Sequence, residues 1–550
     1  MNVRAPFLFE PISKQPYRLN IMRALLVNPF YPIDETPSPP LGLAFIAAAL
    51  ETAGVEVKIH DYVVFPYSRD RLAAEIKTFR PTVLGLTAVT MTFDAAAAVA
   101  RDVKAVDPAV VTVIGGPHVT FRAEATLNEH PELDVIVLGE GEETIVALIH
   151  ALEKGTRWHT ISGLVYRDGP EIVHTGHKPP GIDIDTLPLP ARHLLPLGRY
   201  RALNLSISMT TSRGCPFKCI FCVGRKMVGP RVRYRNPVKV VDEMETLAAY
   251  GFPQINLADD LFTANARHCS AVCDEIIKRR LKVKWTSFAR VDTVSAEVLE
   301  KMKAAGCTAV SFGIETGSAA ILKTIRKGIT LDQVVAAVKL CTRAGLQPHA
   351  SFILGLPGET EATLQETLDF GKRLEALGVA YGFHLLAPFP GTEVRDRCDD
   401  YDIRIATNDW RQYHANRAIV VNRGIRPEVL DEVATGWKKR FDLWLDDVER
   451  RMARGKAQPE EADQVVNLKR TILIYDLMMG SRLERCGCRP ADEDGDAKQA
   501  HLTQLAQTLA AHADNPENEI ADALNQTLQA GFLVWKEENG QACLRWVDYL

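Results

Sequence analysis

Residues 206–222 read SISMTTSRGCPFKCIFC, a short strand pattern that runs directly into a loop with three cysteines. These cysteines, Cys215, Cys219 and Cys222, have the spacing CxxxCxxC. Cubane iron–sulfur clusters usually take four thiolates. Three thiolates in one loop therefore indicate a cluster whose remaining iron is open to an outside ligand, as catalytic metal sites keep an open position. A structural zinc site is the alternative, although zinc typically takes CxxC pairs with two more distant ligands.

The strand at residues 206–211 is the first of six that alternate with helical stretches. Such βα units form a parallel sheet, and six of them predict an open, partial (β/α)6 version of a TIM-like barrel over residues 206–395. Active sites of such barrels lie on the loops that follow the strands, which is where the three cysteines stand. The other strand patterns are QINLA (254–258), VKWTSFA (283–289), AVSFGI (309–314), HASFIL (349–354) and YGFHLL (381–386).

A separate alternation of strands and helices fills residues 20–155. It predicts a doubly wound, Rossmann-like α/β domain, whose ligand-binding loops should follow the carboxyl ends of the strands. The first βα turn, NPFYPIDETPSPPLG (28–42), lacks GxGxxG, so dinucleotide binding is disfavoured. The strand patterns are MRALLVN (22–28), VEVKIHDY (55–62), TVLGLTAV (82–89), VVTVIGG (110–116) and DVIVLGE (134–140).

Two regions lie outside these alternating patterns. Residues 156–205 combine strand-like GLVYRDG with proline-rich IDTLPLPARHLLPL, and proline at this density predicts a linker. Residues 396–550 carry long, charged amphipathic patterns and predict a mainly helical C-terminal region. Because amphipathic helices need an apolar surface to pack on, we expect this region to cover the barrel mouth near the interdomain cleft. Its aromatic segment would then either line a substrate pocket or pack on the barrel's outside, through Trp410, Tyr413 and His414.

Composition narrows the possible classes of protein. The formal net charge of -4 over 550 residues, without a long basic block, argues against nucleic acid as the main partner. No apolar run reaches the ~20 residues needed to cross a bilayer, and residues 1–20 lack the apolar core of a signal peptide. Apart from the one loop the cysteines are scattered, as in a reducing compartment, so we expect a cytoplasmic protein. We expect core positions for Cys269, Cys273, Cys307 and Cys341. Cys486 and Cys488 are expected to be ordinary thiols, because a second cluster would need more ligands and only Cys543 remains in that region.

The cysteine loop resembles the signature of the radical SAM superfamily, which places an aromatic residue, here Phe221, before the last cysteine. The resemblance implies a 4Fe-4S cluster held by the three cysteines, with S-adenosylmethionine (SAM) chelating the open iron. One-electron reduction then releases a 5′-deoxyadenosyl radical. It also implies an external electron donor, such as ferredoxin or flavodoxin.

Further barrel positions match this family in order. Asp259 and Asp260 follow the second strand and would face the amino group of SAM; Arg290 would bind its carboxylate after the third strand. Each also has a structural explanation, since the aspartates could cap a helix and Arg290 could pair with Glu315. The remaining implied contacts to the ribose, amino acid end or adenine are Glu315, Ile353, Gly355, Leu386 and Pro388.

The first domain resembles the cobalamin-binding domain that is joined to radical SAM barrels. The motif DxHxxG, which supplies a cobalt ligand in many cobalamin enzymes, is absent, and His118 is expected to hydrogen-bond within its loop. Glycines would let the corrin approach the backbone, and Glu140 would add a carboxylate toward corrin amides. The alternative is a domain that keeps the fold without the cofactor. The implied cobalamin contacts are Pro39, Leu41, Thr87, Thr90, Met91, Gly115, Gly116, Pro117, His118, Gly139, Glu140 and Gly141.

The resemblance implies a cobalamin-dependent C-methyltransferase that acts on an unactivated carbon of a small-molecule substrate. The related anaerobic magnesium-protoporphyrin monomethyl ester cyclase offers the alternative, a radical cyclase or oxidoreductase without methyl transfer. A cobalamin carrier without its own catalysis is disfavoured by the complete SAM series. Arg233 and Arg235, in a basic stretch after the cysteines, are weaker candidates for contact with an anionic group.

Overall fold

A computed structural model describes residues 22–30, 37–176, 181–490, 495–511 and 515–550. The expected absence of a signal peptide concerns residues 1–20, which lie outside the described residues. Within the described ranges, every helix is too short or too polar to span a bilayer.

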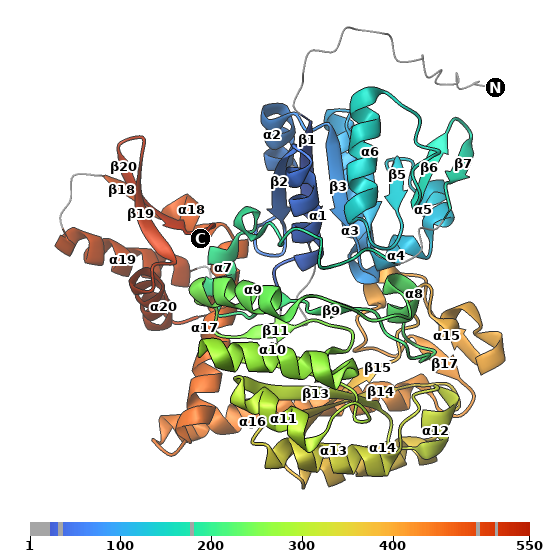
Figure 1. Cartoon of the computed structure of the whole chain (residues 1–550). Helices are drawn as coiled ribbons and strands as arrows, with labels where there is room; N and C mark the ends of the chain where they lie inside the picture. The colour runs from blue at the N-terminus through green and yellow to red at the C-terminus, as the bar shows by residue number, and fades with distance from the viewer. Residues whose placement is uncertain (1–21, 31–36, 177–180, 491–494, 512–514) are drawn as a thin grey trace.

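The first domain is a seven-stranded sheet in the order β2-β1-β3-β4-β5-β6-β7, and the predicted doubly wound fold is confirmed (Figure 1). The first five strands are parallel, whereas β6 and β7 add antiparallel to the edge. The sheet therefore continues past residue 155 into the region expected to be a linker. Its strands are β1 (Arg23–Asn28), β2 (Glu56–Asp61), β3 (Val83–Thr87), β4 (Val111–Gly115), β5 (Val135–Val137), β6 (Leu164–Asp168) and β7 (Glu171–His174). Its helices are α1 (Leu41–Thr52), α2 (Arg69–Phe79), η1 (Thr90–Thr92), α3 (Phe93–Val106), α4 (Pro117–Thr120), α5 (Ala123–Glu129) and α6 (Glu142–Lys154).

The second domain is the expected open barrel, a six-stranded parallel sheet in the order β15-β14-β13-β12-β11-β8. Its strands are β8 (Ile207–Met209), β11 (Ile255–Leu257), β12 (Trp285–Ala289), β13 (Cys307–Glu315), β14 (Gln347–Leu354) and β15 (Ala380–Leu385). The covering helices are α9 (Pro237–Ala249), η3 (Phe262–Ala264), α10 (Ala266–Arg279), α11 (Ala296–Ala304), α12 (Ala319–Thr324), α13 (Leu331–Arg343) and α14 (Glu361–Glu375). The short elements between β7 and α9 are η2 (Arg192–Leu194), α7 (Leu197–Ala202), β9 (Ser212–Arg213), α8 (Gly224–Val228) and β10 (Arg233–Tyr234).

The C-terminal region is mainly helical, as predicted, but it also contains strands. Its helices are α15 (Glu393–Asp396), η4 (Asp399–Tyr401), η5 (Trp410–Gln412), α16 (Pro427–Ala453), α17 (Pro459–Met479), α18 (Arg482–Cys486), α19 (Gly495–Ala510) and α20 (Glu517–Gln529). Its strands are β16 (Ile403–Ile405), β17 (Val420–Asn422), β18 (Cys488–Pro490), β19 (Leu533–Glu538) and β20 (Gln541–Trp546).

The expectation of an ordinary thiol is wrong for Cys488. Cys488 and Cys543 form a disulfide, while Cys486 is an exposed free thiol. The pair forms because β18 and β20 run antiparallel with these two residues directly opposite each other, and opposite side chains in a ladder lie within bonding reach. The 55 residues that separate them in the sequence hid this pairing.

The later tail does not lie where we expected it. The α16 helix packs on the barrel edge, with the Trp437 ring 4.7 Å from Tyr381 and 5.1 Å from Phe383. The following helices lie beside α7 and the β2 edge of the first domain (Figure 1), where the Tyr475 hydroxyl donates to the Val63 carbonyl at 3.2 Å. From α17 onward the tail thus supports the junction from outside. The earlier part of the tail does reach the loops after the barrel strands, where Asn422 Nδ2 donates to the Leu356 carbonyl at 3.5 Å.

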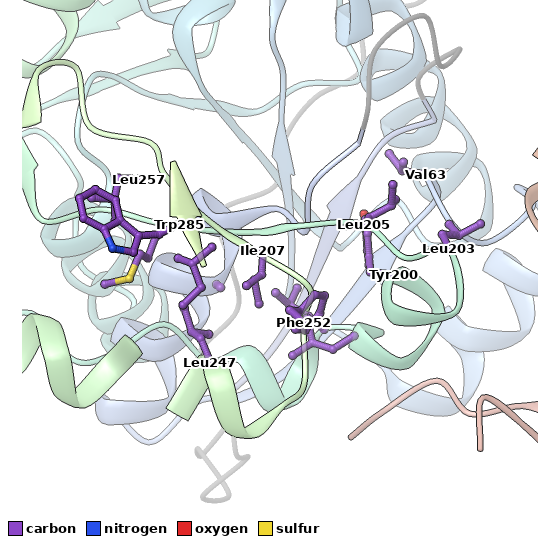
Figure 2. Close-up of a cluster of buried hydrophobic side chains, with 14 of the residues drawn as sticks. Val63, Tyr200, Leu203, Leu205, Ile207, Leu247, Phe252, Leu257 and Trp285 are labelled. Carbon is purple, nitrogen blue, oxygen red and sulfur yellow. The ribbon is translucent and has the colours of Figure 1, made fainter. Parts of the chain in front are cut away.

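One continuous hydrophobic core joins the two domains. Figure 2 shows Tyr200 and Leu205, from α7 and the segment after it, between Val63 of the first domain and Ile207 of the barrel. Tyr200 is fully buried, and its hydroxyl donates to Asp61 Oδ2 at 2.7 Å. Since contiguous burial resists separation of the parts, the loops at the junction keep a fixed relative placement.

Candidate active site

The carboxyl ends of strands from both domains border one cavity of about 400 Å³. Thr87, Gly115 and Gly139 contribute from the first domain, while Thr210 and Ala258 contribute from the barrel. Most other walls are apolar, including Leu26, Leu41, Phe45, Ile46, Leu86, Val113, Val137, Ile145, Met227 and Val228. An apolar cavity with a few polar groups is the usual form of an organic-ligand site.

The cysteine loop lies between β9 and α8, at the carboxyl end of β8. Its first turn depends on Gly214, whose φ of +117° and 2.3 Å gap from an added Cβ to the Arg231 carbonyl oxygen leave no room for a side chain. The loop is then held by the Ile220 amide, which donates to the Ile325 carbonyl at 3.3 Å. Cys215, Cys219 and Cys222 line one cavity of about 230 Å³.

The three thiols do not form a site for a single ion. Among the described residues, no three His, Cys, Asp or Glu side chains converge on a point that could hold one metal ion. A four-iron cubane does not require such convergence, because it holds each thiolate on a separate iron. Burial raises the pKa of the Cys215 and Cys219 thiols, and a bound cation reverses such a shift by stabilising thiolates. The three residues, which line one cavity, therefore fit a cluster.

The two aspartates after β11 have different roles. Asp259 is buried and accepts hydrogen bonds at 2.6 Å from the Thr211 amide, the Thr211 hydroxyl and the Ser212 hydroxyl. Its oxygens thus hold the segment that leads into the cysteine loop, which leaves them little capacity to contact SAM. Asp260 is exposed and accepts from the Gly214 amide at 3.0 Å, so it lies at the loop itself.

Arg290 and Glu315 do not pair with each other, so that suggested structural explanation is wrong. Arg290 pairs with Asp292 through two contacts of 2.9 Å, and its guanidinium lies 3.5 Å from the Phe217 ring centroid. Glu315 is bonded instead to Lys327 Nζ at 2.6 Å. Glu315 is the last residue of β13, and it has a φ of +73° beside a register shift against β14. This conformation is uncommon for a residue other than glycine.

The predicted adenine contacts lie on the loops after β14 and β15. Ile353 is partly buried, Leu386 and Pro388 are buried, and Gly355 has a φ of +84°. Sequence reasoning missed Glu359, which accepts from the Gly355 amide and whose pKa burial raises to about 7. The signal was its position four residues after Gly355 in the GLPGE turn.

Most predicted cobalamin positions lie on the larger cavity. The cavity wall includes Leu41, Thr87, Gly115, Gly116, Pro117, Gly139, Glu140 and Gly141, but not Pro39, Thr90, Met91 or His118. Gly116 has a φ of +110°, and an added Cβ would stand 2.5 Å from the Ala88 carbonyl oxygen. This bare, close-packed backbone beside apolar walls fits a flat, largely apolar ring such as a corrin.

Glu140 has other partners than the corrin amides we expected. Arg213 and Arg233 stand opposite each other in the β9–β10 ladder, where like charges repel. Glu140 accepts from both, at 2.8 and 2.9 Å from Arg233 and 3.0 Å from Arg213. Its carboxylate therefore joins the last loop of the first domain to the start of the cysteine loop. Arg233 thus forms an interdomain ion pair and is not a contact to an anionic ligand. Arg235 is likewise structural, with Glu243 Oε2 2.6 Å away.

The side chain of His118 makes no hydrogen bond to its loop, contrary to expectation. Neither ring nitrogen has a hydrogen-bond partner in the described part of the chain. The ring stacks on Phe93 at 4.4 Å and meets the edge of Trp410 at 4.8 Å, and burial lowers its pKa to about 3. His118 is thus a neutral packing residue away from the cavity.

The aromatic residues Trp410 and Tyr413, after the barrel, have a packing role. Trp410 and Tyr413 are buried, and Arg395 lies 4.9 Å from the Trp410 ring while donating to the Tyr413 hydroxyl at 2.9 Å. With His414, they are absent from the linings of both cavities described above. Trp410 and Tyr413 therefore have a packing role, as the alternative held, but Trp410 packs on His118 and Arg122 of the first domain and not on the barrel's outside.

Comparisons with known proteins agree with this two-domain arrangement. A family model described as the radical SAM superfamily matches residues 209–371, and one described as the B12 binding domain matches residues 35–149. The chain is 36% identical over 403 residues to an uncharacterised methyltransferase of Pyrococcus horikoshii, covering 72% of this chain and 87% of that protein. It is 30% identical over 439 residues to the anaerobic magnesium-protoporphyrin IX monomethyl ester cyclase of Rubrivivax gelatinosus, covering 76% and 77%.

A solved structure with the same fold is that of OxsB, a cobalamin-dependent S-adenosylmethionine radical enzyme with aqua-cobalamin and S-adenosylmethionine bound. The TM-score is 0.67 at 18% identity, and the match covers 95% of this chain and 82% of OxsB. At this identity the likeness shows the fold alone.

Proposed function

Because this chain belongs to the cobalamin-binding radical SAM enzymes, we propose that it methylates an unactivated carbon of a small-molecule substrate. The observation that carries this proposal is the shared cavity, which both domains line and which reaches Arg213, two residues before Cys215. A methyltransferase needs its methyl source and its radical source at one substrate. A cavity at this junction suits that need.

The family's cofactors supply, when bound, a radical that removes a hydrogen atom and a methyl group that replaces it. The chain's own residues provide the setting. Cys215, Cys219 and Cys222 would hold the cluster, and Asp260, Arg290, Glu315, Ile353, Gly355, Leu386 and Pro388 would border SAM. The apolar cavity walls exclude water from reactive species, while the Glu140 ion pairs keep the two halves of the site aligned.

Product analysis tests methylation against cyclase or oxidoreductase chemistry, which the similarity to the cyclase keeps as the second candidate. Reconstituted holoenzyme would be reduced with SAM carrying a deuterated methyl group and a low-molecular-mass extract of the producing cells. We expect comparable amounts of S-adenosylhomocysteine and 5′-deoxyadenosine, with the label in a carbon-bound methyl of a new product by mass spectrometry. A new, unlabelled product with 5′-deoxyadenosine alone would establish the second candidate instead.

The cluster must receive one electron from a donor, and a donor protein would need a surface close to the cysteines on which to dock. Lys218, Arg225, Lys226 and Arg326 line the smaller cavity beside the three cysteines. Lys226 pairs with Asp396 and Arg326 with Glu393, so the excess positive charge of this face comes from Lys218 and Arg225. Opposite charge on a partner accelerates its encounter with such a face. We therefore propose that an acidic one-electron donor, a ferredoxin or flavodoxin, docks here.

Charge reversal at Lys218, which is exposed, tests this surface. In Lys218→Glu we expect reduction by flavodoxin to slow by about tenfold at low salt, since rim charges act mainly on association rates. SAM cleavage driven by dithionite should stay at the wild-type rate. Lys372→Glu, an equal reversal at an exposed lysine of α14, is the control, and equal slowing in both variants would contradict docking at this face.

A further inference from the structure

Glu142 is a buried carboxylate on the larger cavity that sequence reasoning did not single out. It begins α6, its side chain is 6% exposed, and it borders the cavity. One oxygen, Oε1, pairs with Arg213 Nη1 at 2.8 Å. The other, Oε2, has no hydrogen-bond partner within the described residues. A polar oxygen thus stands without a donor in a mostly apolar wall.

Burying a carboxylate oxygen without a hydrogen-bond donor costs free energy. Native proteins leave few buried polar atoms unpaired, because a carboxylate oxygen removed from water loses its hydration without replacement. Its neighbour Glu140 has donors for both of its oxygens. Of these two glutamates, only Glu142 therefore has an oxygen without a donor. Since Glu142 borders the cavity, the missing donor fits a bound ligand.

The surrounding charge favours a neutral donor. Arg213 and Arg233 contribute two positive charges, and Glu140 and Glu142 contribute two negative charges to the same cluster. A cationic ligand group would therefore meet no excess negative charge there, whereas a neutral N–H group needs only an acceptor. Carboxamides project from the rim of the corrin ring and supply N–H groups of this kind.

We propose that Glu142 Oε2 accepts a hydrogen bond from a rim carboxamide of cobalamin, an inference that rests on the proposed function. Through Oε1 the same carboxylate holds Arg213, which directly precedes Gly214 and the cysteine loop. Glu142 is thereby a positioning residue that connects the occupant of the cavity to the loop that would carry the cluster.

The test compares hydroxocobalamin binding by wild type, Glu142→Gln and Glu143→Gln, using the full chain and equilibrium dialysis. Glutamine keeps an oxygen for Arg213 but places an NH₂ donor where Oε2 was, so two donors meet. We expect Glu142→Gln to bind about tenfold more weakly, as for loss of one charge-assisted hydrogen bond. Glu143 is the matched control, because it is exposed on the same turn and does not border the cavity.

A second probe separates the contact from simple damage to the loop. The isomeric cobalamin monocarboxylic acids each replace one rim carboxamide with a carboxylate. One isomer should bind wild type poorly, through repulsion by Glu142, and should lose little or nothing further in Glu142→Gln. Equal weakening of every isomer by the substitution would overturn the proposal.

The remaining outcomes are also distinguishable. Wild-type protein that binds no cobalamin would refute the proposed function itself. Wild type and Glu142→Gln with equal affinity for hydroxocobalamin would refute only this contact. If in that case the variant lost turnover of the labelled product, the donor would belong to the organic substrate.

Discussion

Replacing Cys219 with alanine is expected to remove the iron–sulfur cluster and with it all reductive cleavage of SAM. Two thiolates remain in the loop, and a cubane needs more protein ligands than that to persist. The loss should exceed the ~100- to 1,000-fold typical of deleting one transition-state contact, because the electron source itself disappears. Iron and sulfide content, the charge-transfer absorbance of the anaerobic protein and 5′-deoxyadenosine yield report the result.

The matched control is Cys486→Ala. This cysteine is exposed and free, and it belongs to α18 in the C-terminal region, outside the barrel. It should keep wild-type iron content and cleavage rate. A Cys219→Ala protein that retained full iron and SAM cleavage would disprove the assignment of the cluster to this loop.

Replacing Glu243 with alanine is expected to lower the free energy of unfolding strongly, because it removes a buried carboxylate. Glu243 is 2% exposed on α9 and lies between two buried guanidinium groups, 2.8 Å from Arg192 and 2.6 Å from Arg235. Those arginines also donate to the carbonyls of Ser208 and Thr210, at the end of β8. Without the carboxylate two positive charges stay buried and uncompensated, which costs about 3–5 kcal/mol.

Urea and thermal unfolding of the apo protein would measure the effect. In Glu243→Ala the first transition should move to clearly lower denaturant and temperature, and the cysteine loop should become more susceptible to proteolysis because β8 leads into it. Glu245→Ala, an exposed glutamate on the same helix that pairs with Arg279, should change stability by no more than ~0.5 kcal/mol. Similar transitions in the two variants would contradict the structural role of Glu243.

Some side chains were predicted with the right location and the wrong partner. Glu140 borders the cavity as expected, yet Arg233, 93 residues away in the sequence, takes its oxygens. Asp259 stands after β11 as expected, but the backbone and hydroxyls that follow β8 use its lone pairs. In each case a competing donor from a distant strand decided the role, and no local pattern reveals such competition.

His118 is another residue whose surroundings could not be predicted from the local sequence. Its place in GGPHVT suggested a polar loop residue, but Phe93 and Trp410, the latter 292 positions later in the numbering, enclose it. Burial by these rings keeps the imidazole neutral. Only the packed structure shows that an aromatic from the segment after the barrel lies against the first domain.

The sequence alone determined the alternation of strands and helices in both domains, the three-cysteine loop after β8 and the glycines on the cavity wall. These features depend on residues that are neighbours in the chain, through side-chain periodicity, thiol spacing and backbone freedom. The tertiary structure alone decided which charges pair, where the tail packs, that Cys488 meets Cys543, and that Glu142 keeps one oxygen open to the cavity. Those outcomes depend on distances between residues remote in sequence, where burial and competition among donors select one partner from many.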